Sequence, residues 1–297
     1  MTSIRQIKQE AQAIIEGAAH QNLPKFWITD WLLFVTGKSA TALITENDYE
    51  LNSEELSQFY SGIKKMQNGT PLAYLTGKQA FWRHEFLVNE HTLIPRPDTE
   101  VLVETVLNWI EKNWAKHNHE PSYLPKLLDL GTGSGCIAIS LAAEKSLQNW
   151  QVTAVDISKD ALIIAEKNAK LNDACINFIQ SSWFTAFNND KNSRFDVIVS
   201  NPPYIDEMDS HLTELTAEPI TALTAKNQGL ADIETIVQSA PNFLQNNGLL
   251  AIEHGFDQGS SVRRLFENRG FAAITTLQDF GQNDRVTLGV WQNAGQG

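Results

Sequence analysis

The chain has 297 residues, of which 42% are hydrophobic, and its formal net charge is −12. That length and composition exclude a disordered chain and support one large domain plus a smaller one. The negative charge disfavours broad contact with nucleic-acid phosphates, so no direct nucleic-acid partner is expected. The longest apolar run near the N-terminus, residues 31–35, is too short to span a bilayer, and no signal peptide is apparent. We therefore expect a cytoplasmic protein that binds no membrane, and a monomer.

Cysteine and histidine residues give little indication of a metal site. Cys136 and Cys175 do not form a ligand pair, and both are expected to be small core residues. His117 and His119 lie in a polar stretch that is typical of a surface loop, and no neighbouring cysteine or histidine cluster supports metal binding. We expect no metal.

The N-terminal part of the chain predicts a small helical bundle. Apolar residues recur at helical spacing through most of residues 1–75, which we assign to this bundle. Residues 76–97 are assigned to a linker, because the alternating stretch 81–95 suggests a hairpin around an Asn89–Glu90 turn. Asp98 then predicts a helix cap.

Residues 98–297 predict an α/β domain, because strands and helices alternate from residue 126 onward. That alternation favours a mostly parallel, doubly wound sheet with helices on both faces. The last two strands are joined without a helix and should form an antiparallel pair at one edge. The expected strands are 126–130, 152–157, 176–180, 195–200, 248–253, 272–278 and 285–291.

A glycine-rich turn follows the first of these strands, in the sequence LLDLGTGSGCIAI at 127–139. Glycines allow the backbone to turn sharply and to approach a ligand closely. A dinucleotide-binding motif needs a third glycine where this chain has Cys136. The spacing instead resembles motif I of S-adenosylmethionine (SAM) methyltransferases, in which the loop passes under the amino-acid end of the cofactor. The cofactor-binding residues implied by this resemblance are Gly131, Thr132, Gly133, Ser134 and Gly135.

Two further residues at strand ends fit the nucleoside part of that cofactor. Asp156 ends the next strand, where a carboxylate can accept hydrogen bonds from both ribose hydroxyls. The alternative role for Asp156, a helix cap, is weakened by Ser158, which is better placed as a cap. Trp183 follows the third strand and can pack against adenine. Considered alone it would be a core residue, but its position at the carboxyl edge favours the cofactor.

The sequence Asn-Pro-Pro-Tyr (NPPY, 201–204) follows the fourth strand. Each proline lacks an N–H and holds the preceding residue extended, so the turn offers carbonyl acceptors with few competing donors. The Asn201 side-chain oxygen and the Pro202 carbonyl can hold a planar NH2 group, with the Tyr204 ring packed over it. A merely structural turn and a proline-rich ligand are the alternatives, but the position beside the glycine loop favours a ligand site. We expect Asn201, Pro202 and Tyr204 to be catalytic, Pro203 to contact the substrate with them, and Asn201 also to contact the cofactor.

The tetrapeptide resembles the signature of methyltransferases that modify planar amino or amide nitrogens. Together with seven other segments it resembles the bacterial release factor glutamine methyltransferases, the PrmC or HemK family, from about residue 71 to residue 289. Two positions depart from the family pattern: Ser182 stands where aspartate is common, and Ala217 where phenylalanine often precedes Glu-Pro. The first puts one adenine contact in doubt, because a hydroxyl accepts less strongly than a carboxylate. The other segments are PLAYLTG, FWRHEFLV, LIPRPDTE, LDLGTGSGCIAI, VDIS, GLLAIEHG and GFAAITTLQDFGQNDRVTLG.

The resemblance implies a Rossmann-like class I SAM methyltransferase that produces S-adenosylhomocysteine. Its implied substrate is the glutamine of the Gly-Gly-Gln motif in class I peptide-chain release factors, methylated on the side-chain amide nitrogen. Because the helical bundle carries no recognisable chemistry but is large enough to contact a protein, we expect the substrate to dock on it. An amide nitrogen is a poor nucleophile, so the enzyme is expected to work mainly by placement. No histidine is required, and we interpret His211 and His254 as structural.

Three alternatives remain at the level of sequence. A sister enzyme methylates a glutamine of a large-subunit ribosomal protein with the same NPPY chemistry, but LIPRPDTE and the helical N-terminus favour the release factor. Methylation of an exocyclic amine in DNA or RNA is disfavoured by the acidic charge. A SAM-binding protein without catalysis would leave NPPY without a role.

Overall fold

The computed structural model describes the residues 4–16, 24–45, 49–113, 120, 122–188, 193–209, 212 and 217–292. The sequence predictions on His117, His119 and His211 lie outside these residues. The chain forms two compact units, one of Met1–Lys78 with Ser210–Ala217 and one of Gln79–Asp209 with Glu218–Gly297.

The first unit is helical, which confirms the predicted bundle. Its core packs Trp31 of the second helix against Gly62 of the fourth, where an added Cβ would lie 2.2 Å from the indole ring. The indole N–H donates to the Phe59 carbonyl at 3.0 Å, so the buried ring nitrogen has a partner. Asn52 and Glu55 form a capping box that starts the fourth helix. The helices are α1 (Ile4–Glu16), α2 (Phe26–Thr36), α3 (Ala40–Thr45), α4 (Ser53–Gln67) and α5 (Leu72–Thr76).

The linker contains a two-stranded pair, β1 (Lys78–Phe81) and β2 (His84–Leu87), but the predicted position of its turn was wrong. The chain reverses at Trp82–Arg83 instead of Asn89–Glu90. Trp82 has a positive φ of 55°. Its backbone N–H donates to Glu100 at 2.7 Å and its indole N–H to Glu144 at 2.8 Å. These long-range hydrogen bonds hold a conformation that local sequence does not indicate.

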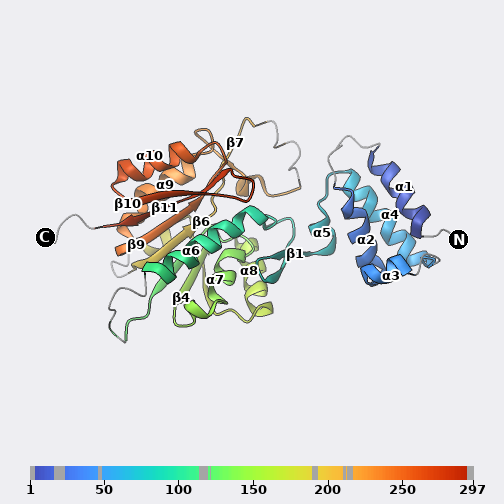
Figure 1. Ribbon diagram of the computed structural model, residues 1–297, viewed down its shortest axis with the longest axis horizontal. Helices are drawn as coiled ribbons and strands as arrows, with labels where there is room; N and C mark the ends of the chain where they lie inside the picture. The colour runs from blue at the N-terminus through green and yellow to red at the C-terminus, as the bar shows by residue number, and fades with distance from the viewer. Residues whose placement is uncertain are drawn as a thin grey trace. The chain divides into compact units, whose positions relative to one another are not determined.

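The second unit contains a seven-stranded sheet in the order β10-β11-β9-β6-β3-β4-β5 (Figure 1). The five strands from β9 to β5 are parallel, and β11 is antiparallel to both of its neighbours. The predicted doubly wound sheet with an antiparallel edge is therefore confirmed. The strands are β3 (Lys126–Leu130), β4 (Gln151–Asp156), β5 (Ile176–Gln180), β6 (Phe195–Ser200), β9 (Leu244–Glu253), β10 (Ala272–Gln278) and β11 (Asp284–Trp291).

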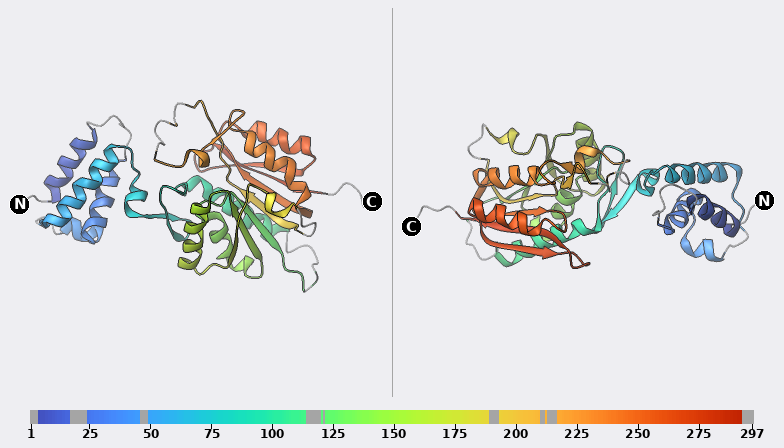
Figure 2. Two further views of the ribbon diagram at one scale, coloured as in Figure 1. Left: turned by 180° about the vertical axis from the view of Figure 1, so that it is seen from behind. Right: turned by 90° about the horizontal axis from the view of Figure 1, so that it is seen from above.

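Helices cover both faces of this sheet (Figures 1 and 2). Successive strand residues point to opposite faces, so Leu127 packs in the core under α6, α7 and α8, and Leu128 in the core under α9 and α10. The helices are α6 (Glu100–Asn113), α7 (Cys136–Ala142), α8 (Lys159–Leu171), α9 (Ala231–Ser239) and α10 (Gly259–Arg269). Short elements are the 3-10 turns η1 (Pro97–Thr99), η3 (Lys145–Leu147), η4 (Thr185–Phe187), η6 (Ile220–Ala222) and η7 (Ala240–Asn242), and the paired strands β7 (Ile205–Asp206) and β8 (Thr224–Ala225).

Two smaller predictions were wrong. Asp98 does not cap a helix, because it lies inside η1; its carboxylate instead pairs with Arg285 at 3.6 Å. Cys136 is buried as expected, but Cys175 is exposed, since it lies in the connection between α8 and β5. Within the described residues, no helix is both long and apolar enough to cross a membrane.

Candidate active site

The glycine loop lies at the point where the strand order reverses. β3 has β4 on one side and β6 on the other, which places its carboxyl end at a topological switch point. The backbone N–H groups of Gly131 and Thr132 both donate to the Val155 carbonyl at 2.9 Å. On the other side, the Ser200 hydroxyl donates to the Leu130 carbonyl at 2.8 Å. The glycine loop, Asp156 and NPPY therefore meet at one edge of the sheet, as the sequence predicts.

Each of the three loop glycines adopts a left-handed backbone conformation. The φ angles of Gly131, Gly133 and Gly135 are 72°, 54° and 83°. At Gly135 an added Cβ would lie 2.9 Å from the Ile139 side chain, whereas at Gly133 it would meet nothing within 4 Å. The loop thus requires glycine for its conformation, and at Gly133 it leaves open space beside the backbone.

Two buried polar side chains, Asp129 and Asn168, hydrogen-bond the glycine loop. The Thr132 hydroxyl donates to Asp129 at 2.6 Å, and burial raises the pKa of that carboxyl to about 7 although the hydrogen bond from Thr132 opposes the rise. The Asn168 amide donates to the Ser134 carbonyl at 2.9 Å and also bonds the backbone of Leu87. Sequence reasoning missed both roles. A carboxylate inside an apolar strand was the available signal for Asp129.

Asp156 is oriented by backbone donors on both of its carboxylate oxygens. Oδ2 accepts from the Gly133 N–H and Oδ1 from the Ser158 N–H, each at 2.8 Å. Burial raises the pKa of Asp156, and these hydrogen bonds oppose the rise. Ser158 accepts from the Ala161 N–H and caps α8, as predicted. A carboxylate oxygen can accept more than one hydrogen bond, so both oxygens of Asp156 retain acceptor capacity for a diol.

Trp183 lies beside the glycine loop. Its ring would be 3.3 Å from a Cβ at Gly131, and its side chain opposes the rise that burial gives the pKa of Asp232. It also packs against the core of the sheet, so the two roles weighed for it from sequence are not exclusive. Its φ of 47° is unusual for a bulky residue and turns the chain at this edge. The neighbouring Ser182 is exposed.

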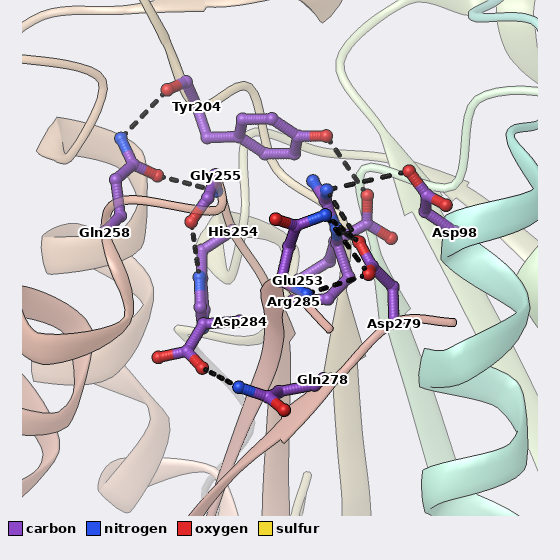
Figure 3. Close-up of polar contacts among 11 residues, drawn as sticks. Asp98, Tyr204, Glu253, His254, Gly255, Gln258, Gln278, Asp279, Asp284 and Arg285 are labelled. Atoms are coloured by element: carbon purple, nitrogen blue, oxygen red, sulfur yellow. Dashed lines mark hydrogen bonds and ion pairs between the residues drawn. The ribbon is translucent and has the colours of Figure 1, made fainter. Parts of the chain in front are cut away.

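The NPPY turn is held by three side chains from elsewhere in the chain. The Asn201 amide nitrogen donates to the Thr99 hydroxyl at 3.2 Å. The Tyr204 hydroxyl donates to Glu253 at 3.2 Å, and the Tyr204 carbonyl accepts from Gln258 at 2.9 Å (Figure 3). Sequence reasoning found the tetrapeptide but none of these partners.

Tyr204 lies beside a cluster of charged side chains, Glu253, Arg285 and Asp279, which are largely buried. Burial raises the pKa of Glu253 to about 7, whereas hydrogen bonds from Thr99 and Tyr204 and the charge of Arg285 oppose that rise. Burial, followed by the Glu253 charge, raises the pKa of Tyr204. Arg285 pairs with Asp279 at 3.0 Å (Figure 3).

His254 has partners that suit a structural role. It is buried, and its two ring nitrogens lie 2.9 Å from the Gly255 carbonyl and from the Thr287 hydroxyl. Since a carbonyl only accepts, Nδ1 carries the hydrogen and Nε2 accepts from Thr287. Burial lowers the pKa of His254, which favours this neutral form.

The LIPRPDTE segment contacts Glu218 within the second unit. Arg96 forms an ion pair with Glu218, whose carboxylate also accepts from the Ile94 N–H at 3.1 Å. Nothing in this arrangement explains alanine at 217. No group of histidine, cysteine and acidic residues suited to a metal ion occurs in the part of the chain that the structure describes.

Two protein families match the chain. The family described as "Methyltransferase small domain" matches residues 117–226, and the "PrmC N-terminal domain" matches residues 9–77. Among curated proteins, the release factor glutamine methyltransferase of Pasteurella multocida is 43% identical, with 87% of this chain and 88% of the relative covered. The protein of the same name from Escherichia coli K12 is 41% identical, with 86% and 88% covered.

Solved structures share the fold at low sequence identity. The hMettl16 catalytic domain, solved with the MAT2A 3′UTR hairpin 6, has a TM-score of 0.52 at 16% identity and covers 71% of this chain and 76% of its own. The Thermus thermophilus 16S rRNA N2 G1207 methyltransferase, solved with AdoMet and guanosine, has a TM-score of 0.50 at 17% identity and covers 72% and 50%. These likenesses concern the fold alone.

Proposed function

The chain belongs to the release factor glutamine methyltransferase family, and on that premise we propose how its residues transfer a methyl group from SAM to a release-factor glutamine. It is a SAM-dependent enzyme with a Rossmann-like methyltransferase domain. The relatives do not favour the ribosomal-protein or nucleic-acid alternatives. The proposal extends to class I factors, to the glutamine of the Gly-Gly-Gln motif, and to a monomeric enzyme in the cytoplasm.

The residues at the carboxyl edge fit SAM. The left-handed glycines and the open space at Gly133 suit the close approach of an amino-acid end to the backbone. Asp156 has the acceptor capacity for two ribose hydroxyls, and Trp183 offers an aromatic face beside the loop. SAM supplies a methyl group made electrophilic by its bound sulfonium sulfur. We assign Gly131, Thr132, Gly133, Ser134, Gly135, Asp156, Trp183 and Asn201 to its binding.

The NPPY turn suits the substrate amide. The Asn201 nitrogen is engaged by Thr99, so the side-chain oxygen is the atom left to accept from a ligand. This oxygen and the Pro202 carbonyl accept hydrogen bonds from the two hydrogens of an NH2 group, while Pro203 and Tyr204 pack against the substrate side chain. Such acceptors favour the positive charge that develops on the nitrogen. The methylated amide is then acidic enough to lose one proton to solvent without a dedicated base. Orientation of the reacting groups contributes about 7–11 kcal/mol of barrier reduction in comparable reactions.

The observation that carries this proposal is the convergence of the glycine loop, Asp156 and NPPY at one switch point of the sheet. The test incubates the protein with labelled SAM and, separately, with a release factor, a ribosomal subunit and DNA. We expect label on the release factor. Label on the ribosomal subunit or on DNA, with none on the release factor, would contradict the proposal.

A further inference from the structure

The orientation of the Asn201 amide decides whether the proposed site can work. The oxygen and nitrogen of a primary amide are similar in size, so packing alone does not select which of them faces a ligand. Only the oxygen accepts from a substrate NH2 group. A reversed Asn201 would present its own NH2 to the substrate, and two donors would oppose each other.

Thr99 determines this orientation through the direction of its hydroxyl hydrogen. The Asn201 nitrogen lies 3.2 Å from the Thr99 hydroxyl oxygen. The Thr99 hydroxyl also lies near enough to the Glu253 side chain to oppose the rise that burial gives the pKa of that carboxyl. A hydroxyl has one hydrogen, and an ionised carboxylate only accepts. Above about pH 7, where Glu253 is ionised, the hydrogen of Thr99 is therefore directed to Glu253, and its oxygen is left to accept from the Asn201 nitrogen.

Glu253 also fixes the other end of the tetrapeptide. The Tyr204 hydroxyl is directed at Glu253 and donates to Oε1 at 3.2 Å (Figure 3). The carboxyl group at the end of β9 thus accepts from the tyrosine of this turn and lies beside the hydroxyl that contacts Asn201.

Stability does not account for a carboxylate at this position. Glu253 is 1% exposed, and its second oxygen, Oε2, has no hydrogen-bond partner among the residues that the structure describes. A buried acceptor without a partner lowers the stability of the fold, because the lost hydrogen bonds to water are not replaced. A neutral side chain of the same shape would avoid the burial of a charge.

We propose that Glu253 is a positioning residue for methyl transfer, which acts through Thr99 and Tyr204 to hold the Asn201 oxygen toward the substrate amide. This inference deepens the proposed function and rests on it. Glu253 itself touches neither substrate nor cofactor in this account. Its effect is therefore expected on turnover, with cofactor affinity unchanged.

The test compares Glu253→Gln with a matched control at another buried carboxylate. Glutamine keeps the shape but donates as well as accepts, so it no longer dictates the Thr99 hydroxyl. Asp196 lies near the amino end of β6 and accepts from Tyr123 and the Lys126 N–H, at the opposite edge of the sheet. Above about pH 7, we expect Glu253→Gln to keep its SAM Kd and its KM for the release factor while kcat falls on the order of tenfold or more. Asp196→Asn should keep the wild-type kcat.

A second pair of variants separates orientation from packing. Thr99→Val removes the hydroxyl at constant shape and should lower kcat as Glu253→Gln does, whereas Thr99→Ser restores the hydroxyl and should recover most of the loss. Wild-type kcat in Glu253→Gln, or equal kcat in Thr99→Val and Thr99→Ser, would overturn the inference. Absence of methyl transfer by the wild-type enzyme would instead contradict the proposed function and overturn both.

Discussion

At the scale of single residues, Asn201 carries the substrate end of the proposed site. Asn201→Ala removes the acceptor oxygen but leaves the glycine loop and Asp156 in place. Because the other residues assigned to SAM remain, we expect SAM affinity to change little. Methyl transfer should fall by roughly a hundredfold or more, the usual effect of removing a positioned polar group. Calorimetry and single-turnover rates with labelled SAM measure the two quantities. Wild-type turnover in this variant would show that the Asn201 oxygen does not hold the substrate NH2 group.

Asp156 carries the cofactor end. Because its carboxylate both accepts from the Gly133 N–H and offers acceptors for the ribose, Asp156→Ala is expected to abolish SAM binding while the domain stays folded. Asp160 is exposed in the first turn of α8, and Asp160→Ala provides a control that should bind SAM normally. Unchanged SAM affinity of Asp156→Ala by titration calorimetry would remove this residue from the site.

The raised pKa of Glu253 should make the unfolding free energy depend on pH. Its pKa is raised from 4.5 to about 7 by burial, with Thr99, Arg285 and Tyr204 opposing and Asp98 adding to the rise. Between these values the unfolded state is ionised while the folded state holds the proton, so stability falls as pH rises. Glu253→Gln removes this dependence. Its unfolding free energy relative to wild type should increase from about pH 4.5 to about pH 7, by on the order of 3 kcal/mol. Urea titrations that give a pH-independent difference would contradict the assignment.

Sequence alone predicted the residues that carry a recognisable motif and missed those that act through long-range contacts. Asn201, Asp156 and the glycines stand at strand ends, where position and residue type indicate a ligand. Thr99 and Gln258 carry no such signal, because their roles arise only when segments distant in the chain meet. Glu253 was detectable in principle, since a charged residue ends the apolar strand GLLAIE.

At the scale of elements, the glycine loop provides a paired test. Gly133 and Gly135 share a left-handed conformation, so alanine at either position costs roughly 1–2 kcal/mol of backbone strain. Only at Gly135 does the added Cβ also approach Ile139 and Ala165, at 2.9 and 3.2 Å. Gly135→Ala should therefore be less stable than Gly133→Ala by about 1 kcal/mol or more in denaturant unfolding. Equal stability of the two variants would contradict the packing described for this turn.

The elements themselves were predictable where periodicity was strong. Every strand of the large sheet coincides with a predicted apolar run, although β9 begins at Leu244, four residues before the predicted start at 248. The antiparallel edge follows from a connection too short for a helix. The predicted position of the hairpin turn was wrong because Trp82 adopts a positive φ, which is stabilised by hydrogen bonds to Glu100 and Glu144, residues distant in the sequence. The prediction that Asp98 caps a helix was wrong because a 3-10 turn, which contains Asp98, precedes α6.

At the scale of the whole molecule, the helical bundle is proposed to recognise the folded substrate. Binding energy remote from the reacting group helps to orient it, so the bundle should matter for a folded release factor and not for a short peptide. We expect a truncated chain that starts at Gly69 to bind SAM and to methylate an intact release factor far more slowly than the full chain. Its rate on a Gly-Gly-Gln peptide should equal that of the full chain. Equal rates of the two chains on the intact factor would show that the bundle does not dock the substrate and only stabilises the rest of the protein.

NPPY is proposed to place a release-factor glutamine for methylation on its side-chain nitrogen. The most direct measurement digests a release factor after reaction with SAM and locates the added methyl group by fragment mass spectrometry, for the wild-type enzyme and for Asn201→Ala. We predict one methyl group on the glutamine of Gly-Gly-Gln with the wild type, and little or none with the variant over the same time. A methyl group on any other residue, or equal methylation by the variant, would contradict the account.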